Sequence, residues 1–224
     1  MKETVPFLDF FPPLLAHSIV TIEIALGAAA LALVLALVAG LARLARSWTV
    51  RATARVYIEF FRGSSALVQL FWLFFVLPHF GILLEPVTVG IVGLGLNGGA
   101  YGAEIVRGAV LSVARGQYEA ATALNMSRAQ AMRRVILPQA FVAMMPPFGN
   151  LFIELLKSTA LVSLITITDL TFRANQLVVY TLQSMEIYGI TLNIYFVMAL
   201  AIIVFMRRAE RRLARGLARV ERTT

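Results

Sequence analysis

Charged side chains inside long apolar stretches are the residues of this chain best placed to do chemistry. Glu104, Glu154 and Lys157 lie in stretches long enough to cross a bilayer, as does Glu23. Ionisable groups are costly in such a setting, so we expect each either on a transport path or in an ion pair. A spacing of three residues would pair Glu104 with Arg107, which favours a structural ion pair near the inner surface. The same spacing in Glu154 and Lys157 leaves a path and a structural pair equally open.

A polar break is expected within the third apolar stretch, at Asn97-Gly98-Gly99. The Asn97 amide could hydrogen-bond a zwitterionic solute, which adds it to Glu104, Glu154 and Lys157 as a candidate for the substrate path. The two glycines also suit close packing between helices through small residues, and this simpler interpretation is favoured.

The sequence lacks the residues that several other kinds of site would need. The chain has no Cys, which excludes disulfides, thiolate nucleophiles and Cys metal sites. His17 and His79 are far apart, so neither is expected to hold a metal. No Gly-x-x-x-x-Gly-Lys-Ser/Thr phosphate loop occurs, so the chain is not expected to hydrolyse ATP. We therefore expect no catalytic residue, no metal and no cofactor on this chain.

The elements that must position these residues are membrane helices. Of 224 residues, 59% are hydrophobic and 14% charged, whereas soluble domains average about 45–50% and about 25%. A bilayer crossing needs roughly 20 apolar residues. The composition predicts an all-α membrane protein of about five transmembrane helices in one domain, 1–224, with a core of about 14–210. The predicted segments are 14–41, 57–77, 88–110, 141–166 and 188–206.

Positive charge follows the apolar segments in a regular alternation. The net charge is +8, and the basic residues gather at 43–55, 107–134 and 207–222. The connections at 78–86 and 167–187 contain a single Lys or Arg between them, Arg173. This is the positive-inside pattern and not a nucleic-acid groove, so the N-terminus is expected outside and the C-terminus inside. The basic tail, 207–224, reads as an amphipathic helix with Leu213, Leu217 and Val220 on one stripe and its arginines toward anionic lipid head groups.

One cytoplasmic connection has a helical pattern of its own. Ala120, Ala121 and Leu124 would form a small apolar face, and Asn125 and Ser127 would then break the helix. A second helix is expected to follow, with Pro138 near its end. Periodicity leaves two interpretations of this loop, 115–138, equally open: docking of a soluble partner, or an amphipathic element lying on the membrane.

The residues of this loop resemble the signature loop of ABC importer permeases. That signature has Glu-Ala-Ala, three residues, a Gly, then nine residues before Ile-x-Leu-Pro. Here Asn125 stands where Gly is expected and Val135 where Ile is expected; Asn is the next-best residue for a positive φ, so the turn should survive. By this resemblance the ATPase-docking residues are Glu119, Ala120, Ala121, Leu124, Asn125, Leu137 and Pro138.

The resemblance extends over about residues 21–206, to the permeases of the polar amino-acid family. Residues 62–69 are similar to its Arg-Gly-Thr-Pro-Leu-Leu-Val-Gln stretch, with Ser65 where the Pro is expected, and 100–108 and 155–161 match as well. Within that family, 70–75 and 161–166 look most like the ectoine/hydroxyectoine uptake permeases.

The resemblance implies a MetI-like type I ABC importer transmembrane domain with a cytoplasmic coupling helix, multi-pass in the bacterial cytoplasmic (inner) membrane. Its expected partners are two cytoplasmic ATPases that bind ATP and Mg²⁺, a second permease (identical or paralogous), an extracytoplasmic solute-binding protein and lipid, with no nucleic acid. The expected cargo is a polar amino acid or a zwitterionic compatible solute, with ectoine and hydroxyectoine favoured. The alternative is a secondary transporter or channel for small solutes. It would need internal inverted repeats, which the sequence does not show.

Overall fold

The computed structural model describes residues 6–221, with side chains described to residue 213. This part of the chain is entirely helical and contains no strand. A short 3₁₀ turn, Phe7–Phe10, leads into the first long helix. The α-helices are α1 Phe11–Ala42, α2 Trp48–Gly63, α3 Ala66–Phe71, α4 Pro86–Ser112, α5 Arg115–Ala123, α6 Arg128–Ala131, α7 Leu137–Ser158, α8 Leu170–Thr181 and α9 Ser184–Glu221.

Among the described residues, four helical stretches are long and apolar enough to cross a membrane: Phe7–Ala42, Pro86–Ser112, Arg128–Ile165 and Ser184–Leu213. A fifth span arises if Trp48–Gly63 and Ala66–Phe80 count as one, although they meet at 102°. The all-α, multi-pass prediction is confirmed. The segment predicted at 57–77 is not a single unbroken helix, because Ser64 and Ser65 both adopt extended backbone angles and turn the chain.

Two side-chain amides donate hydrogen bonds to the backbone carbonyl of Phe61, which is free at this bend. Gln69 Nε2 donates to Phe61 O at 3.0 Å and to Ser64 Oγ at 2.7 Å. Asn97 Nδ2, from α4, donates to Phe61 O at 2.9 Å and to Gln69 Oε1 at 3.2 Å. Within a membrane the carbonyls freed at a broken helix need such protein partners. The break predicted at residues 97–99 is therefore wrong: α4 runs through it, and Asn97 serves the break in the neighbouring span.

Small residues let α1 and α4 approach closely, which confirms the packing interpretation of the α4 glycines. On α1 the fully buried positions include Ala28, Ala32 and Ala36. A Cβ placed on Gly102 of α4 would lie only 2.6 Å from the Ala36 Cβ, much closer than side chains normally come. Backbone contact of this kind is how helices associate where lipid removes most of the hydrophobic driving force.

Gly102→Ala should destabilise the folded protein, because α1 and α4 must move apart to fit the new methyl group. The expected loss is about 1–3 kcal/mol, the usual cost of overpacking. Thermal unfolding in detergent measures it. Gly108→Ala, on the same helix, is the control, since a Cβ there meets nothing within 4 Å. Equal melting temperatures for the two variants would contradict this account of the packing.

The connection at 167–187 contains helix α8. Its N-cap is Asp169, whose Oδ1 accepts from Phe172 N at 2.9 Å. Burial raises the pKa of this carboxyl, and the hydrogen bonds at the cap act in the opposite direction. Leu170 N donates to Thr21 Oγ1 of α1 at 3.1 Å. The sequence signal for α8 is its N-cap, an Asp followed by apolar residues at helical spacing.

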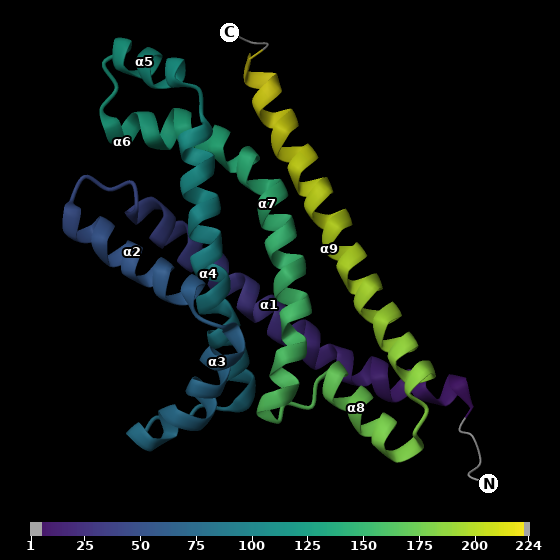
Figure 1. Cartoon of the computed structure of the whole chain (residues 1–224). Helices are drawn as coiled ribbons and strands as arrows, with labels where there is room; N and C mark the ends of the chain where they lie inside the picture. The colour runs from purple at the N-terminus through teal and green to yellow at the C-terminus, as the bar shows by residue number, and fades with distance from the viewer. Residues whose placement is uncertain (1–5, 222–224) are drawn as a thin grey trace.

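The loop at 115–138 and the start of α1 lie at opposite ends of the molecule. Helices α5 and α6 lie at the end where α9 finishes, whereas α8 and the start of α1 lie at the other (Figure 1). This arrangement is what the predicted orientation requires. The helix predicted for the basic tail continues out of the last span as far as Glu221. Its apolar stripe at Leu217 and Val220, and residues 222–224, lie outside the described side chains and residues.

Candidate functional site

The turn between α5 and α6 is closed by two backbone hydrogen bonds. Met126 N donates to Ala121 O at 3.0 Å, and Asn125 N donates to Thr122 O at 2.9 Å. Asn125 has a φ of 53°, in the left-handed region. This is a Schellman helix end with Asn in the position that Gly most often occupies. The predicted turn is confirmed, and the substitution of Asn for Gly leaves its geometry intact.

A capping box starts the second helix of the loop. Gln130 N donates to Ser127 Oγ at 3.3 Å, and Ser127 N donates to Gln130 Oε1 at 2.9 Å. The prediction that this helix ends near Pro138 is wrong. After α6 the chain makes a wider π-helical turn, Met132–Ile136, and continues as α7, with Pro138 in the first turn of α7. The wider turn accommodates a residue that lacks a backbone N–H.

Some of the predicted docking residues are exposed to solvent on the loop, and others are buried. Glu119, Ala120 and Leu124 are exposed, as are Asn125 and Pro138. The Leu124 side chain is 72% exposed, which is high for a large apolar residue on a fixed turn. Ala121 is buried, so the single face predicted for Ala120, Ala121 and Leu124 is divided between solvent and the protein interior. Leu137 is half-buried.

Polar contacts hold the loop against the membrane helices. Tyr118 Oη donates to Val110 O of α4 at 3.0 Å. Gln139 Nε2 of α7 donates to Gln117 Oε1 of α5 at 3.1 Å. Arg115 and Glu119 form only an exposed pair at 3.5 Å. Because α5 is tied to both α4 and α7, a force on the exposed residues would reach two spans directly.

A second feature is a groove of about 1050 Å³ between α7 and α9. Apolar side chains such as Phe196 make up most of its lining. The polar lining comes from Asn150, Glu154 and Lys157 on α7 and from Tyr188, Thr191 and Tyr195 on α9. Glu154 and Lys157 are exposed to it, and neither makes an ion pair within residues 6–221. No ion pair joins these two side chains in the described part of the chain, and their place on a substrate path stays a prediction. An apolar groove with a few convergent polar groups is typical of small-molecule sites.

The other candidates for the substrate path lie elsewhere. Glu104 Oε2 accepts from Arg107 at 2.8 Å and 2.9 Å, and Glu104 Oε1 lies 3.8 Å from Arg43 Nε, so the predicted ion pair is confirmed. Asn97 is engaged at the bend of the second span. Neither lines the groove. Glu23 is exposed on α1 and has no ion-pair partner in the described part of the chain.

The α9 side of the groove was not identified from the sequence. Tyr188, Thr191 and Tyr195 line it at spacings of three and four residues. That spacing puts hydroxyl-bearing side chains on one face of an otherwise apolar helix, and it was readable as a polar stripe.

Comparison with known proteins agrees with this architecture. The chain matches the family described as "Binding-protein-dependent transport system inner membrane component" over residues 32–218. It is 49% identical to the probable amino-acid ABC transporter permease protein y4tF of Sinorhizobium fredii, over 90% of this chain and 87% of that protein. It is 36% identical to the L-cystine transport system permease TcyB of Bacillus subtilis, over 94% and 91%. With the glutamine transport system permease GlnP of Escherichia coli it shares 38%, over 81% and 84%.

Solved structures show the same fold. A crystal structure of an amino acid ABC transporter with histidines has a TM-score of 0.86 and 37% identity, covering 94% of this chain and all of that chain. An inward-facing MetNI methionine ABC transporter, at 19% identity, has a TM-score of 0.78 over 92% of this chain and 98% of that one, which supports the fold alone. The chain belongs to the binding-protein-dependent transport system inner membrane components and is a multi-pass permease subunit of an ABC importer with the MetI-like type I fold.

Proposed function

We propose that this permease forms the path for a small zwitterion, a polar amino acid, which is imported at the expense of ATP hydrolysed on partner subunits. The observation that carries the proposal is that Glu154 and Lys157 both line the groove between α7 and α9 and make no ion pair with the described residues. One carboxylate and one ammonium group, a single helical turn apart, complement the ammonium and carboxylate of an amino acid. The names of the permeases compared above, for an amino acid, L-cystine and glutamine, support the same class.

Ectoine and hydroxyectoine are the second candidate. They combine a carboxylate with a delocalised cation, so they suit the same two side chains. The resemblance that favoured them rests on residues 70–75 and 161–166, and neither stretch lines the groove. The relatives compared above do not name such a solute, which is why a polar amino acid is now placed first.

We infer the remaining machinery from the family, and the exposed loop residues support the inference. Two cytoplasmic ATPases would each receive a loop carrying Glu119 and Leu124, and ATP and Mg²⁺ would bind to them and not to this chain. A second permease, identical or paralogous, would complete the path. An extracytoplasmic binding protein would deliver the solute at the end where α8 lies, in the bacterial inner membrane.

Reconstitution tests this proposal. The permease, its ATPase and its binding protein are placed in liposomes, and ATP hydrolysis and uptake are measured with glutamine, glutamate, cystine, histidine, arginine and ectoine. Stimulation by one or more amino acids is the expected result. Stimulation by ectoine alone would overturn the amino-acid proposal. Accumulation of solute without ATP or the ATPase would establish the alternative, a secondary transporter or channel.

Asn125→Gly should keep ATPase docking or strengthen it, because Gly adopts the left-handed conformation at no steric cost. Asn125→Val should weaken docking, because a β-branched residue at φ 53° is strained by on the order of 1–3 kcal/mol. Copurification of the ATPase with tagged permease measures both. Equal yields of ATPase with the two variants would show that the turn geometry does not control docking.

A further inference from the structure

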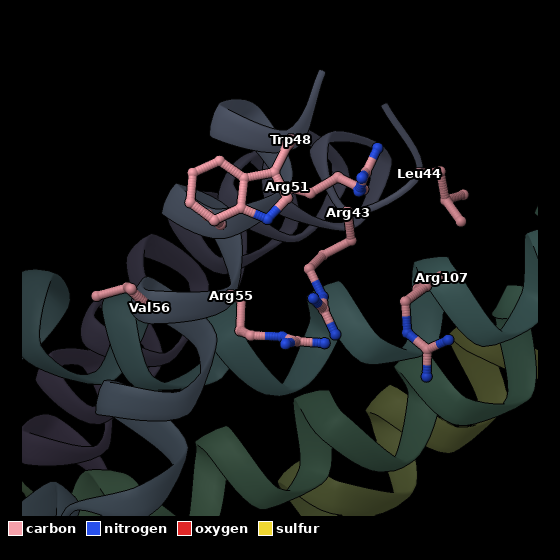
Figure 2. A pocket seen from close by; sticks show the side chains of 8 residues that line it. Arg43, Leu44, Trp48, Arg51, Arg55, Val56 and Arg107 are labelled. Atoms are coloured by element: carbon pink, nitrogen blue, oxygen red, sulfur yellow. The ribbon is translucent and has the colours of Figure 1, made fainter. Parts of the chain in front are cut away.

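A cavity of about 500 Å³ lies where α1 ends and α2 begins. Four arginines line it: Arg43 at the end of α1, Arg51 and Arg55 on α2, and Arg107 on α4. We call these four residues and their cavity the arginine pocket. Figure 2 shows the side chains of Arg43 and Arg55 reaching toward one another, with Arg107 beside them. None of these residues belongs to the coupling loop or to the groove between α7 and α9.

The arginine pocket carries more positive charge than the protein balances. Glu104 lies against Arg107 and Arg43, which leaves an excess of three positive charges for four arginines and one carboxylate. Counting Glu59, which pairs with Arg55 at 3.5 Å, still leaves two. Arg43 Nε is enclosed and has no hydrogen-bond partner among the described residues. Its nearest carboxylate oxygen, Glu104 Oε1, lies 3.8 Å away. A buried donor without a hydrogen bond is costly, so an anion in this pocket would be stabilising.

The pocket is held in place before any ligand arrives. One terminal nitrogen of Arg51 donates to Ala45 O at 2.9 Å and to Arg46 O at 2.7 Å, which fixes the turn between α1 and α2. Arg107 is fixed by its two contacts with Glu104. Guanidinium groups that are already oriented lose little freedom on binding, and their fork geometry suits the oxygens of a phosphate.

An apolar groove adjoins this pocket along α2. Its volume is about 520 Å³, and it shares Ala52 and Val56 with the arginine pocket before continuing past Tyr57, Phe60 and Phe61. At the rim, Trp48 is 73% exposed, and Val56 and Phe60 are exposed as well. A Trp between a basic cluster and an apolar surface is typical of the membrane–water interface. A ligand that fills both cavities has an anionic head and an apolar chain.

We propose that the arginine pocket binds the phosphate headgroup of an anionic phospholipid of the cytoplasmic leaflet, with an acyl chain in the groove along α2. Basic pockets between membrane helices on the cytoplasmic side are suited to such headgroups. A free phosphate would leave the apolar groove unused. The bound lipid would link α1 and α2 to α4. Helix α4 in turn leads directly into the loop at 115–138.

Binding of labelled phosphatidylglycerol to the purified full-length permease, in phosphatidylcholine nanodiscs, tests this directly and needs no transport. Arg43→Gln combined with Arg55→Gln should weaken binding by roughly thirtyfold, because each basic residue near an anionic lipid contributes roughly fivefold. Arg133→Gln with Arg134→Gln removes the same charge from exposed positions of the loop and is the control, with little change expected. Unchanged binding in the Arg43/Arg55 variant would overturn the proposal.

A second variant guards against misfolding of the first. Val56→Asp places a carboxylate in the apolar groove at an exposed position and leaves the arginines in place; it too should weaken phosphatidylglycerol binding. Inorganic phosphate and glycerol 3-phosphate distinguish the source of the phosphate: full displacement of the labelled lipid by either one would show a site for a soluble anion. If the ATPase shields these arginines while they bind no phosphatidylglycerol, the occupant of the pocket is an acidic segment of that partner. Displacement by a soluble anion and shielding by the ATPase would each overturn a lipid site.

Discussion

Leu124→Arg should abolish ATP-dependent uptake while the permease remains folded in the membrane. Leu124 is exposed on a closed turn, so the substitution removes no packing from the permease itself. In the proposed complex the same side chain enters a cleft of the ATPase, where a guanidinium without a counter-charge would be desolvated. The expected cost is about 3–5 kcal/mol of docking free energy, or a loss of more than about a hundredfold in affinity. Copurification of the ATPase and uptake in proteoliposomes measure this effect.

Two further variants make this result specific. Ala129→Arg adds the same charge to an exposed position of α6 outside the docking set, and uptake should persist. Glu119→Ala should weaken docking less than Leu124→Arg, because Glu119 makes only an exposed pair within the permease. If Leu124→Arg leaves the complex and uptake intact, the loop does not dock the ATPase. Equal losses in Leu124→Arg and Ala129→Arg would point to a general charge effect.

The loop was predictable because its geometry is determined locally. A left-handed Asn at the end of one helix and a Ser–Gln capping box at the start of the next involve residues a few positions apart. Sequence spacing is enough to recognise such chemistry. The continuation past Pro138 escaped the same reasoning, because a π-helical turn has no comparable residue signature.

The bend in the second span shows where local reasoning stops. Asn97 was predicted to lie in a break of its own helix, but its partner, Phe61 O, is 36 residues away. Only the folded arrangement shows that Asn97 stabilises a neighbouring broken helix and leaves its own helix straight. Glu154 and Lys157 give the opposite lesson: their spacing permits an ion pair, yet both side chains are exposed to the groove between α7 and α9.

Removal of either groove charge should have the second large effect. Lys157→Met and Glu154→Gln are each expected to lower uptake by about 10- to 100-fold, since a hydrogen bond to a charged group contributes about 1.5–3 kcal/mol. The lining around them is largely apolar, so water compensates little for the lost partner. Assembly with the ATPase should be unchanged, because both residues are far along α7 from the loop. Uptake as a function of solute concentration, together with copurification, separates the two effects.

The exchanged double variant decides whether these residues bind the solute or merely balance one another. Glu154→Lys with Lys157→Glu keeps one charge of each sign on the same helix turn. If the two residues contribute only a neutral pair, uptake should return in the double variant. If each orients one end of a zwitterion against Thr191 and Tyr195 on α9, the reversed pair should remain as impaired as the single variants. Glu23→Gln is the matched control, because it removes a charge that is exposed on α1 and lies outside the groove. A comparable loss of uptake in this variant would show that transport depends on intramembrane charge in general and not on the groove between α7 and α9.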